Sequence, residues 1–399
     1  MVLGFLLARA GIEVLVLEKH ADFFRDFRGD TIHPSTLELM HDLGVLEDFL
    51  RVPHQQLSSI GAVIDDFTVP IADFSHLPTH CKFVGLMPQW DFLNFISAKA
   101  KAYPEFHLRM ESEVTDLLVE NNRVAGVRVK TPHGELEIRA DLVIGADGRH
   151  SLVRAKANLE VLDLGAPIDV LWMRVSRQPG DPEQTLGRFR TGKLLVTLNR
   201  DDYWQCAYVI PKGAFLSIQE KGLPTFREDL ESVAPFLRGR GAELKSWDDI
   251  KLLSVAVDRL RHWSRPGLLC IGDSAHAMSP IGGVGINLAI QDAVAAANIL
   301  APLFAREAKA ERQPDSAHQP GISHPDALAV IDSHLHEIQN RREFPTRVTQ
   351  GFQVLAHKRL IGPALATTIP ITRLPLPLRL LQRFPILRRI PARMVGLGV

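Results

Sequence analysis

The segment LLCIGDSAHAMSPIGGVGINLAIQDA, from Leu268 to Ala293, restricts the fold of this chain more than any other part of it. A short apolar run is followed by Gly272 and Asp273, then by Pro280, several glycines and the start of a long amphipathic helix. This order presents free backbone N–H groups at a helix N-terminus, which suits an electron-rich or anionic group. It predicts a backbone surface for the pyrimidine edge of a flavin, with Asp273 accepting a hydrogen bond from a ribityl hydroxyl.

A second motif, DLVIGADGRHSLVR, spans Asp141–Arg154 and predicts a strand, a tight turn and a helix. Gly148 permits close approach of the backbone to a ligand, and Asp147 is placed to orient the turn. An Ala-Asp-Gly turn alone is common in loops, whereas the whole string is specific. The motif points to the same cofactor as the first.

The beginning of the chain predicts the second half of a nucleotide-binding β-α-β unit. A helix over the first ten residues stops at Gly11, and a buried parallel strand follows that ends at Glu18. An acid in that position binds ribose hydroxyls about 20 residues after a glycine fingerprint. Gly4 supports this interpretation, because a small residue lets the helix pack closely on the sheet. We therefore expect a strand and GxGxxG to be encoded immediately before Met1; the alternative is that Glu18 is only a charged strand end.

Periodicity divides the rest of the chain into two kinds of region. From about Val161 to His262 strands follow one another without a phosphate-loop signature, as in the wall of a substrate cavity. The segment Ala308–Pro325 is expected to be a mobile connection. The other expected elements are helices at Pro34–Leu43 and Trp90–Tyr103, a meander at Val114–Val119, Val124–Lys130 and Glu135–Arg139, and strands at Ile168–Val175, Leu194–Asn199 and Trp204–Ile210.

Charge and cysteine content exclude several classes of protein. Lys+Arg and Asp+Glu both number 46, so the net charge gives no sign of a nucleic-acid partner. Three separated cysteines, without CxxC or a secretory signal, favour a reducing, cytoplasmic setting. No uncharged apolar run reaches the ~18 residues that a membrane span needs. We predict no metal site.

The three motifs, in this order and spacing, resemble the class A FAD-dependent monooxygenases related to para-hydroxybenzoate hydroxylase, here truncated at the N-terminus. The strings RGDTIHPSTLELM (Arg28–Met40) and MPQWDFLNFI (Met87–Ile96) resemble the same family, and the similarity extends from Met1 to about His357. The resemblance implies an α/β fold: a Rossmann-like FAD-binding domain, an interleaved β-sheet substrate domain and a helical C-terminal tail. It assigns 1–62, 85–160 and 262–343 to the FAD-binding domain, 63–84 and 161–261 to the substrate domain, and 344–399 to the basic tail.

The resemblance also assigns roles to individual residues. Glu18 would bind the adenosine ribose, Gln89 would lie near the pyrophosphate, and Asp147 and Gly148 would form a turn shared by FAD and NAD(P)H. Arg28 and Pro280 would lie at the catalytic flavin–substrate region. The full set of predicted cofactor-binding residues is Glu18, Lys19, Arg28, Gln89, Val114, Asp147, Gly148, Gly272, Asp273, Pro280, Gly283, Gly285, Ile286 and Asn287.

The implied reaction is NAD(P)H-dependent hydroxylation of an aromatic or quinone-like small molecule by O₂, through a C4a-hydroperoxyflavin. Two alternatives remain: a flavin-dependent reductase of the same fold, and a truncated product without activity. A halogenase is disfavoured, because the WxWxIP string of such enzymes is replaced here by Cys206–Pro211. The substrate, the choice between NADH and NADPH, and the oligomeric state stay open.

Several side chains that could act in catalysis or contact substrate could instead have a purely structural role. His276 suits a proton relay or a histidine satisfied by its own surroundings, whereas His33 and Cys270 fit structural roles better. Tyr203, Trp204 and Tyr208 face either the substrate cavity or, as aromatic residues in strands more often do, the packed core.

The C-terminal tail needs its own explanation. Residues 344–399 contain nine Lys and Arg residues and no acid, and prolines divide the last part into short apolar pieces. The leucines either cap the hydrophobic core, with the arginines in water, or contact the inner face of an anionic membrane. We expect a cytoplasmic enzyme and favour the first alternative.

Overall fold

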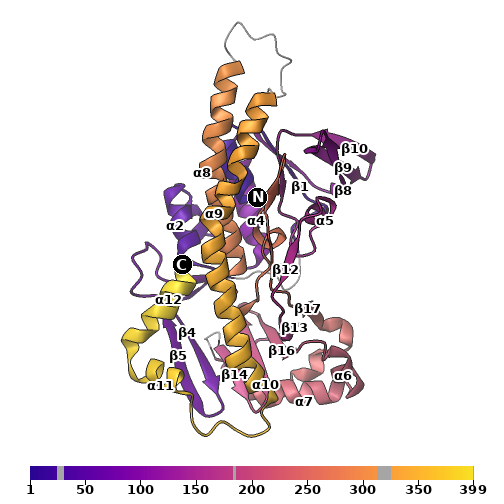
Figure 1. Cartoon of the computed structure of the whole chain (residues 1–399). Helices are drawn as coiled ribbons and strands as arrows, with labels where there is room; N and C mark the ends of the chain where they lie inside the picture. The colour runs from indigo at the N-terminus through magenta and orange to yellow at the C-terminus, as the bar shows by residue number, and fades with distance from the viewer. Residues whose placement is uncertain (25–30, 183–185, 312–324, 399) are drawn as a thin grey trace.

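The computed structural model describes residues 1–399 except 25–30, 183–185, 312–324 and 399. A nucleotide-binding region lies at one end of the molecule and an antiparallel sheet at the other, and the long helix α9 (Pro325–Ala356) runs from the first toward the second (Figure 1). The mixed α/β architecture confirms the predicted fold class. The predicted Arg28 and most of Ala308–Pro325 lie outside the described residues.

The nucleotide-binding region begins as the sequence predicts. Helix α1 (Val2–Arg9) ends before Gly11, whose φ of 79° is left-handed, and leads into strand β1 (Val14–Leu17). Strand β1 pairs in parallel with β7 (Phe106–Arg109). A Cβ on Gly4 would lie 2.9 Å from Val16 Cγ2, so the close packing of helix on sheet requires glycine there.

The two cofactor motifs form neighbouring strands. Strand β11 (Val143–Gly145) pairs in parallel with β20 (Leu268–Cys270), which pairs with β19 (Ser264–Arg265). The predicted meander is confirmed as β8 (Glu113–Glu120), β9 (Arg123–Thr131) and β10 (Gly134–Arg139). Cys270 is fully buried in β20, which confirms its structural role.

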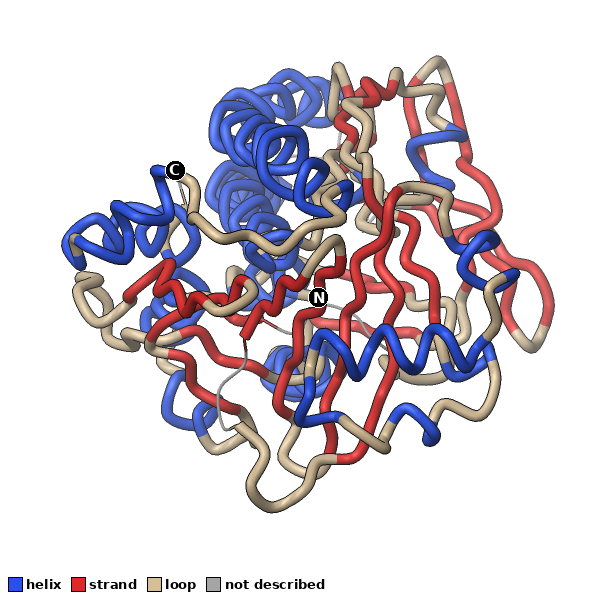
Figure 2. The backbone as a smooth tube through the Cα atoms, turned by 90° about the horizontal axis from the view of Figure 1, so that it is seen from below, coloured by secondary structure: helices blue, strands red, loops and turns tan. Residues whose placement is uncertain are grey.

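The second region is a seven-stranded sheet in the order β17-β13-β16-β15-β14-β4-β5. Its strands are β4 (Ser59–Ile64), β5 (Phe67–Asp73), β13 (Ile168–Ser176), β14 (Leu186–Arg190), β15 (Lys193–Asn199), β16 (Tyr203–Pro211) and β17 (Lys251–Ser254). The expected boundary at residue 62 falls inside β4. One face of the sheet packs against α6 (Phe215–Glu220) and α7 (Leu223–Val233). In Figure 2, where the molecule is seen from below, a helix lies across the strands.

Side-chain alternation divides this sheet into two faces. Leu171, Met173 and Val175 of β13 point into the core with α7, whereas Ile168, Val170 and Trp172 line a large cavity. Trp204 and Tyr208 belong to the core face, where they contact Phe236 and Phe226, so their packing interpretation is confirmed. Tyr203 does not line the cavity either; its ring lies under the Arg174 guanidinium.

Helix α8 (Gly285–Glu311) packs against both α1 and α9, and Figure 1 shows α8 and α9 side by side. The stretch Ile281–Arg306, which includes most of α8, is the one helical stretch among the described residues that is long and apolar enough to cross a membrane. Its contacts are those of a core helix. The chain then forms α10 (Gly362–Ala366), α11 (Leu376–Arg383) and α12 (Arg389–Gly396), and the last two lie beside β5.

The remaining elements connect these parts. They are β2 (Thr31–Ile32), α2 (Pro34–Asp42), α3 (Leu46–Leu50), β3 (Gln55–Leu57), β6 (Val84–Leu86), α4 (Gln89–Ala100), α5 (Leu152–Lys156), β12 (Val161–Asp163) and β18 (Asp258–Leu260). The helices expected at Pro34–Leu43 and Trp90–Tyr103 are confirmed as α2 and α4. The expected boundary between residues 343 and 344 falls inside α9.

Candidate functional site

A cavity of about 2560 Å³ lies between the nucleotide-binding region and the seven-stranded sheet. Small-molecule pockets usually measure ~300–1,000 Å³, so this space can hold a dinucleotide together with a second molecule. All of the predicted cofactor residues line it except Arg28, which is outside the described residues, and Asn287. Those that do are Glu18, Lys19, Gln89, Val114, Asp147, Gly148, Gly272, Asp273, Pro280, Gly283, Gly285 and Ile286.

The loop after β20 forms the centre of the cavity wall. Between Ile271 and Pro280 every residue is buried except Asp273 and Pro280, so these two are presented toward the cavity they line. Gly272 has a φ of 61°, and a Cβ there would lie 2.9 Å from the Cβ of Ala289 in α8. Glycine is therefore required for the loop to lie this close to the helix.

The glycine loop that follows is fitted against β2. A Cβ on Gly283 would lie 2.2 Å from Thr31 Oγ1, which donates a hydrogen bond of 2.7 Å to the Gly283 carbonyl. Asn287 fixes the same junction. Its Oδ1 accepts hydrogen bonds from His33 N at 2.9 Å and Thr36 Oγ1 at 2.8 Å, and its Nδ2 donates to Thr31 O at 3.0 Å.

His33 completes this junction and connects it to the end of the chain. Its side chain is buried, and its Nδ1 lies 2.6 Å from the Val395 carbonyl in α12. Burial lowers the pKa of His33 to about 4, so the ring is neutral near pH 7. His33 also lines the cavity, and its Nε2 is buried without a hydrogen-bond partner among the described residues, so its structural role stays a prediction.

The second motif has the turn that the sequence predicts. Asp147 accepts hydrogen bonds from Ser151 Oγ at 2.5 Å and Val153 N at 3.1 Å, and Gly148 has a φ of 86°. Arg154, at the end of the motif, forms a buried ion pair with Asp258 at 3.1 Å. Asp258 also accepts a hydrogen bond from Ala277 N at 3.3 Å, which links the turn to the loop after β20.

Glu18 lies at the end of β1, as expected, and is partly exposed at the cavity edge. Its Oε1 accepts a hydrogen bond of 2.9 Å from His20 N. Gln89 begins α4 on the same cavity wall. The two thus lie on separate elements that border one space, where one extended ligand can reach both.

A buried charged group holds the loop after β20 from behind. Asp292 of α8 accepts a hydrogen bond from Gly272 N at 3.0 Å, and it pairs with His276 Nε2 at 2.6 Å and Arg342 Nε at 2.8 Å. Burial favours the neutral acid, but His276 and Arg342 outweigh it and hold the Asp292 pKa below its usual value. His276 Nε2 is therefore paired with Asp292, whereas its Nδ1 is buried without a hydrogen-bond partner among the described residues, and the ring does not line the cavity.

Helix α9 supplies a row of polar side chains that sequence reasoning missed. Gln339 accepts a hydrogen bond from Trp263 N at 3.0 Å, and Gln350 donates to the carbonyls of Asp258 at 2.7 Å and Ala277 at 3.0 Å. All members of the row are buried and lie three or four residues apart, which is the spacing of one helix face. The members in α9 are Gln339, Arg342, Thr346, Gln350 and Gln353, and His357 continues the row directly after the helix ends.

The end of this polar row reaches the glycine loop. Gln353 accepts from Ser279 N at 3.0 Å and donates to the carbonyls of Ser279 and Ile281, both at 3.0 Å. His357 Nε2 lies 2.9 Å from Ser279 Oγ. The backbone on both sides of Pro280 is thus positioned by α9. The signal was present in the sequence as polar residues at helical spacing.

Comparison with known proteins agrees with this geometry. The family model described as FAD binding domain matches residues 1–325. The 6-methylpretetramide 4-monooxygenase of Streptomyces rimosus is 32% identical over 320 residues, which cover 78% of this chain and 75% of that protein.

Two solved structures show the same fold. The PqsL protein of Pseudomonas aeruginosa in complex with 2-aminobenzoylacetate has a TM-score of 0.72 at 19% identity, covering 92% of this chain and 95% of that one. The anhydrotetracycline hydroxylase OxyS of Streptomyces rimosus has a TM-score of 0.69 at 21% identity, covering 99% of this chain and 73% of that one.

Proposed function

Because the chain belongs to the FAD binding domain family and is a FAD-dependent monooxygenase of the aromatic hydroxylase type, we propose that it uses NAD(P)H and O₂ to hydroxylate an aromatic or quinone-like small molecule. One oxygen atom enters the substrate as a hydroxyl group, and the other leaves as water with the two electrons of NAD(P)H. The observation that carries this proposal is the single cavity in which all three cofactor motifs meet an apolar wall.

The residues around the cavity fit FAD. Gly272, Gly283 and Gly285 line the cavity without side chains, so the backbone around Asp273 and Pro280 is open to a planar ring. We assign Asp273 to a ribityl hydroxyl and Glu18 to the adenosine ribose, with Gln89 near the pyrophosphate. When bound, FAD would supply the redox chemistry by accepting electrons from NAD(P)H and activating O₂.

The seven-stranded sheet supports an aromatic substrate. Its cavity face is apolar, and a wall of this kind excludes water from the site of oxygen transfer. The residues of this wall are Ile168, Val170, Trp172, Leu194, Val196, Leu198, Ala207 and Val209. The names of the relatives, a pretetramide monooxygenase and an anhydrotetracycline hydroxylase, also favour a ring substrate.

The experiment combines spectroscopy with isotope labelling. Purified protein supplied with FAD is expected to give the visible absorption of bound oxidised flavin. A panel of phenols and quinone precursors is then screened for faster NAD(P)H oxidation, and the product is analysed after reaction under ¹⁸O₂. One labelled oxygen per product supports hydroxylation, NAD(P)H oxidation with an unlabelled reduced product supports the reductase, and a protein without a visible flavin band contradicts both.

Asp273→Ala tests the assignment of the cofactor site. Loss of a buried hydrogen bond to a charged acceptor costs about 1.5–3 kcal/mol, or roughly tenfold or more in the dissociation constant for FAD. Titration of the apoprotein with FAD measures it. Asp163→Ala is a suitable control, because this exposed acid lies in β12 and does not line the cavity. Equal affinities in both variants would contradict the role of Asp273.

We also propose that α11 and α12 contact an anionic lipid surface. Large apolar side chains in this region are half or more exposed: Leu376 at 64%, Phe384 at 50%, Ile386 at 64% and Ile390 at 59%. The arginines Arg379, Arg383, Arg389 and Arg393 are exposed among them. Apolar and cationic groups that lie together on short helices fit the boundary between lipid headgroups and acyl chains, and each cation contributes about 1 kcal/mol there.

Other residues of the same region pack on the protein. Leu374 and Ala392 are buried, and a Cβ on Gly396 would lie 2.6 Å from Leu77 Cδ1. The expected capping of the core is therefore confirmed for these residues and wrong for Leu376 and its exposed neighbours. Contact with a membrane would bring the enzyme to an apolar substrate dissolved in the bilayer.

A further inference from the structure

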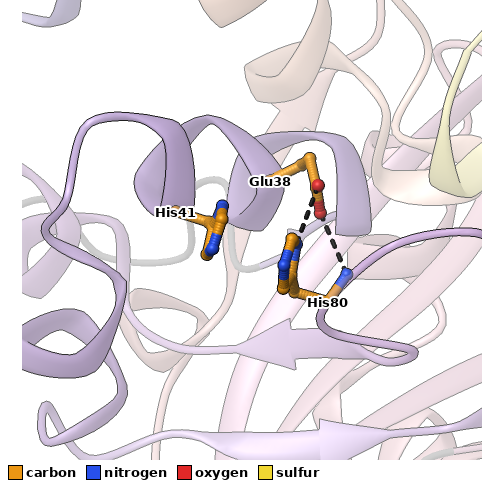
Figure 3. Close-up of side chains that lie close together, drawn as sticks. All are labelled: Glu38, His41 and His80. Atoms are coloured by element: carbon orange, nitrogen blue, oxygen red, sulfur yellow. Dashed lines mark hydrogen bonds and ion pairs between the residues drawn. The ribbon is translucent and has the colours of Figure 1, made fainter.

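A compact group of potential metal ligands lies outside the cavity, on the surface of α2. Glu38 and His41 are one turn apart on this helix, and His80 reaches them from the segment between β5 and β6. Figure 3 shows the Glu38 and His80 side chains pointing toward each other, with the His41 ring beside them. Their donor atoms all lie within 4.8 Å of one another, and no other group of three His, Cys, Asp or Glu residues in the described ranges does so.

The contacts within this group fix one imidazole in position. Glu38 Oε1 lies 2.9 Å from His80 Nδ1, and Glu38 Oε2 accepts a hydrogen bond of 3.0 Å from His80 N. The ring of His41 stacks on that of His80, with 3.5 Å between the centroids and 18° between the planes. The side chains of His41 and His80 are 45% and 53% exposed, so an ion and a water ligand have access.

We propose that Glu38, His41 and His80 bind one divalent transition-metal ion, with Zn²⁺ as the reference ion and water at the remaining position. Two imidazoles and one carboxylate are a donor set that Zn²⁺ accepts, at ~2.0–2.2 Å from each ligand atom. These bond lengths place tetrahedral ligand atoms roughly 3.3 Å apart. The pair Glu38–His80 is already within that separation, and rotation of the exposed His41 side chain closes the rest.

The ion would connect α2 to the segment between β5 and β6. The start of α2 is held by Asn287 through Thr36, whereas the segment leading to His80 packs through Phe74 and Leu77 against α12. A metal that joins α2 to this segment restrains both. Because the ion binds the folded chain, it raises the free energy of unfolding in proportion to the logarithm of its concentration over its dissociation constant.

The test measures Zn²⁺ binding directly. FAD-loaded protein is dialysed against Zn²⁺, and bound metal is quantified per chain, with Co²⁺ absorption as an independent reading of coordination by histidine. One ion per chain is expected. His41→Ala and His80→Ala should each weaken binding by roughly tenfold or more, since even groups that only support a ligand contribute 10–100-fold. Glu38→Gln should weaken it as well.

His76→Ala is the matched control. His76 is exposed, lies in the same segment as His80, and pairs with Asp73 at 3.6 Å instead of joining the group. It should bind Zn²⁺ as the native chain does. Absence of stoichiometric Zn²⁺ in the native protein, or equal binding in all four variants, would overturn the proposal. The FAD content of each variant is measured in parallel, so that a failure of the metal site is distinguished from a failure of the cofactor site.

Discussion

Helix α9 and the pair α11–α12 both reverse the usual distribution of side chains, but in opposite directions. Proteins bury apolar residues and expose polar ones. The inner face of α9 instead buries Gln350, Gln353 and Arg342, at 0%, 2% and 9% exposure. The outer face of α11–α12 exposes apolar residues, among them Leu376 and Ile386.

The difference between the two regions lies in what satisfies the misplaced groups. A buried polar group costs free energy unless it is hydrogen-bonded, and Gln350 and Gln353 are bonded to the backbone of β18 and of the loop after β20. Their partners are inside the molecule. The apolar groups of α11–α12 are not covered by other described residues, so we infer that they contact another molecule. The buried polar groups of α9 thus position the cofactor site, whereas the exposed apolar groups of α11–α12 form a binding surface.

The largest expected effect comes from removing a buried partner of α9. Asp292→Ala leaves the Arg342 guanidinium and the Gly272 N–H buried without their partner. Removing one member of a buried ion pair costs about 3–5 kcal/mol. We expect a free energy of unfolding lower by that amount, measured by urea denaturation, together with weaker FAD binding because the loop that carries Asp273 loses its support.

Asp181→Ala is the control for this prediction. Asp181 also forms a buried ion pair, with Arg240, and neither residue lines the cavity. This variant should lose similar stability while the folded fraction keeps its affinity for FAD. If both variants lose affinity equally, the role of Asp292 is general stability rather than positioning.

A second prediction concerns pH and the inner edge of α12. Burial lowers the His33 pKa to about 4 in the folded chain, against about 6.5 when it is unfolded. The unfolded chain therefore binds a proton first as the pH falls below 6.5, and stability is lost down to about pH 4. The loss attributable to His33 between pH 7 and pH 5 is about 2 kcal/mol.

His33→Asn tests this. Asparagine can donate a hydrogen bond to the Val395 carbonyl but does not titrate, so the variant should lose less stability between pH 7 and pH 5 than the native chain. Parallel pH profiles for the two proteins would show that other groups carry the acid sensitivity. The pKa of His357 is also lowered by burial, so His357 would then be the next group to substitute.

The third prediction concerns one member of the polar row. Gln353→Leu keeps most of the side-chain volume but leaves Ser279 N and the Ser279 and Ile281 carbonyls without their partner. An unsatisfied buried group costs about 1–3 kcal/mol. FAD affinity should fall by roughly tenfold, because the backbone on both sides of Pro280 relaxes. Asn340→Leu, on the exposed side of the same helix, should change neither stability nor affinity.

The sequence predicted those features whose chemistry is local. Gly4 follows from the close packing of α1 on β1, and Asp147 follows from the geometry of its turn, so spacing along the chain was sufficient for these two. The row on α9 was missed because its partners lie far away in sequence: Gln353 and Ser279 are 74 residues apart. Without those partners, glutamines at helical spacing look like an ordinary solvated face.

The sequence could not distinguish core capping from membrane contact in the tail for a related reason. The chain alternates leucine, proline and arginine, and this local pattern does not indicate which leucines pack on the protein. In the structure Leu374 is buried, whereas Leu376, two residues later, is 64% exposed. The sequence also could not predict that Glu38, His41 and His80 lie together, because His80 comes from a different segment than the other two.

The last prediction has the smallest effect on the fold and tests the exposed side of the comparison. Leu376→Gln, Leu380→Gln and Phe384→Gln, made together, remove apolar groups that touch water, so the free energy of unfolding should stay within about 0.5 kcal/mol per substitution. Co-sedimentation with vesicles containing phosphatidylglycerol should be lost.

Point variants are preferable to truncation, because Leu374 and Ala392 of the same region are buried and their removal would open the core. Leu216→Gln, at a residue of α6 that is 71% exposed, is the control and should sediment like the native chain. Arg379→Gln with Arg383→Gln should weaken binding roughly 30-fold at low salt, the equivalent of about 1 kcal/mol for each cation removed. Neutral phosphatidylcholine vesicles and high salt should both release the native protein, since the attraction to the lipid is partly electrostatic. Failure of the native protein to sediment with anionic vesicles would contradict the lipid proposal, and concentration-dependent dimers that dissociate in the triple variant would assign the same surface to a second copy of the chain.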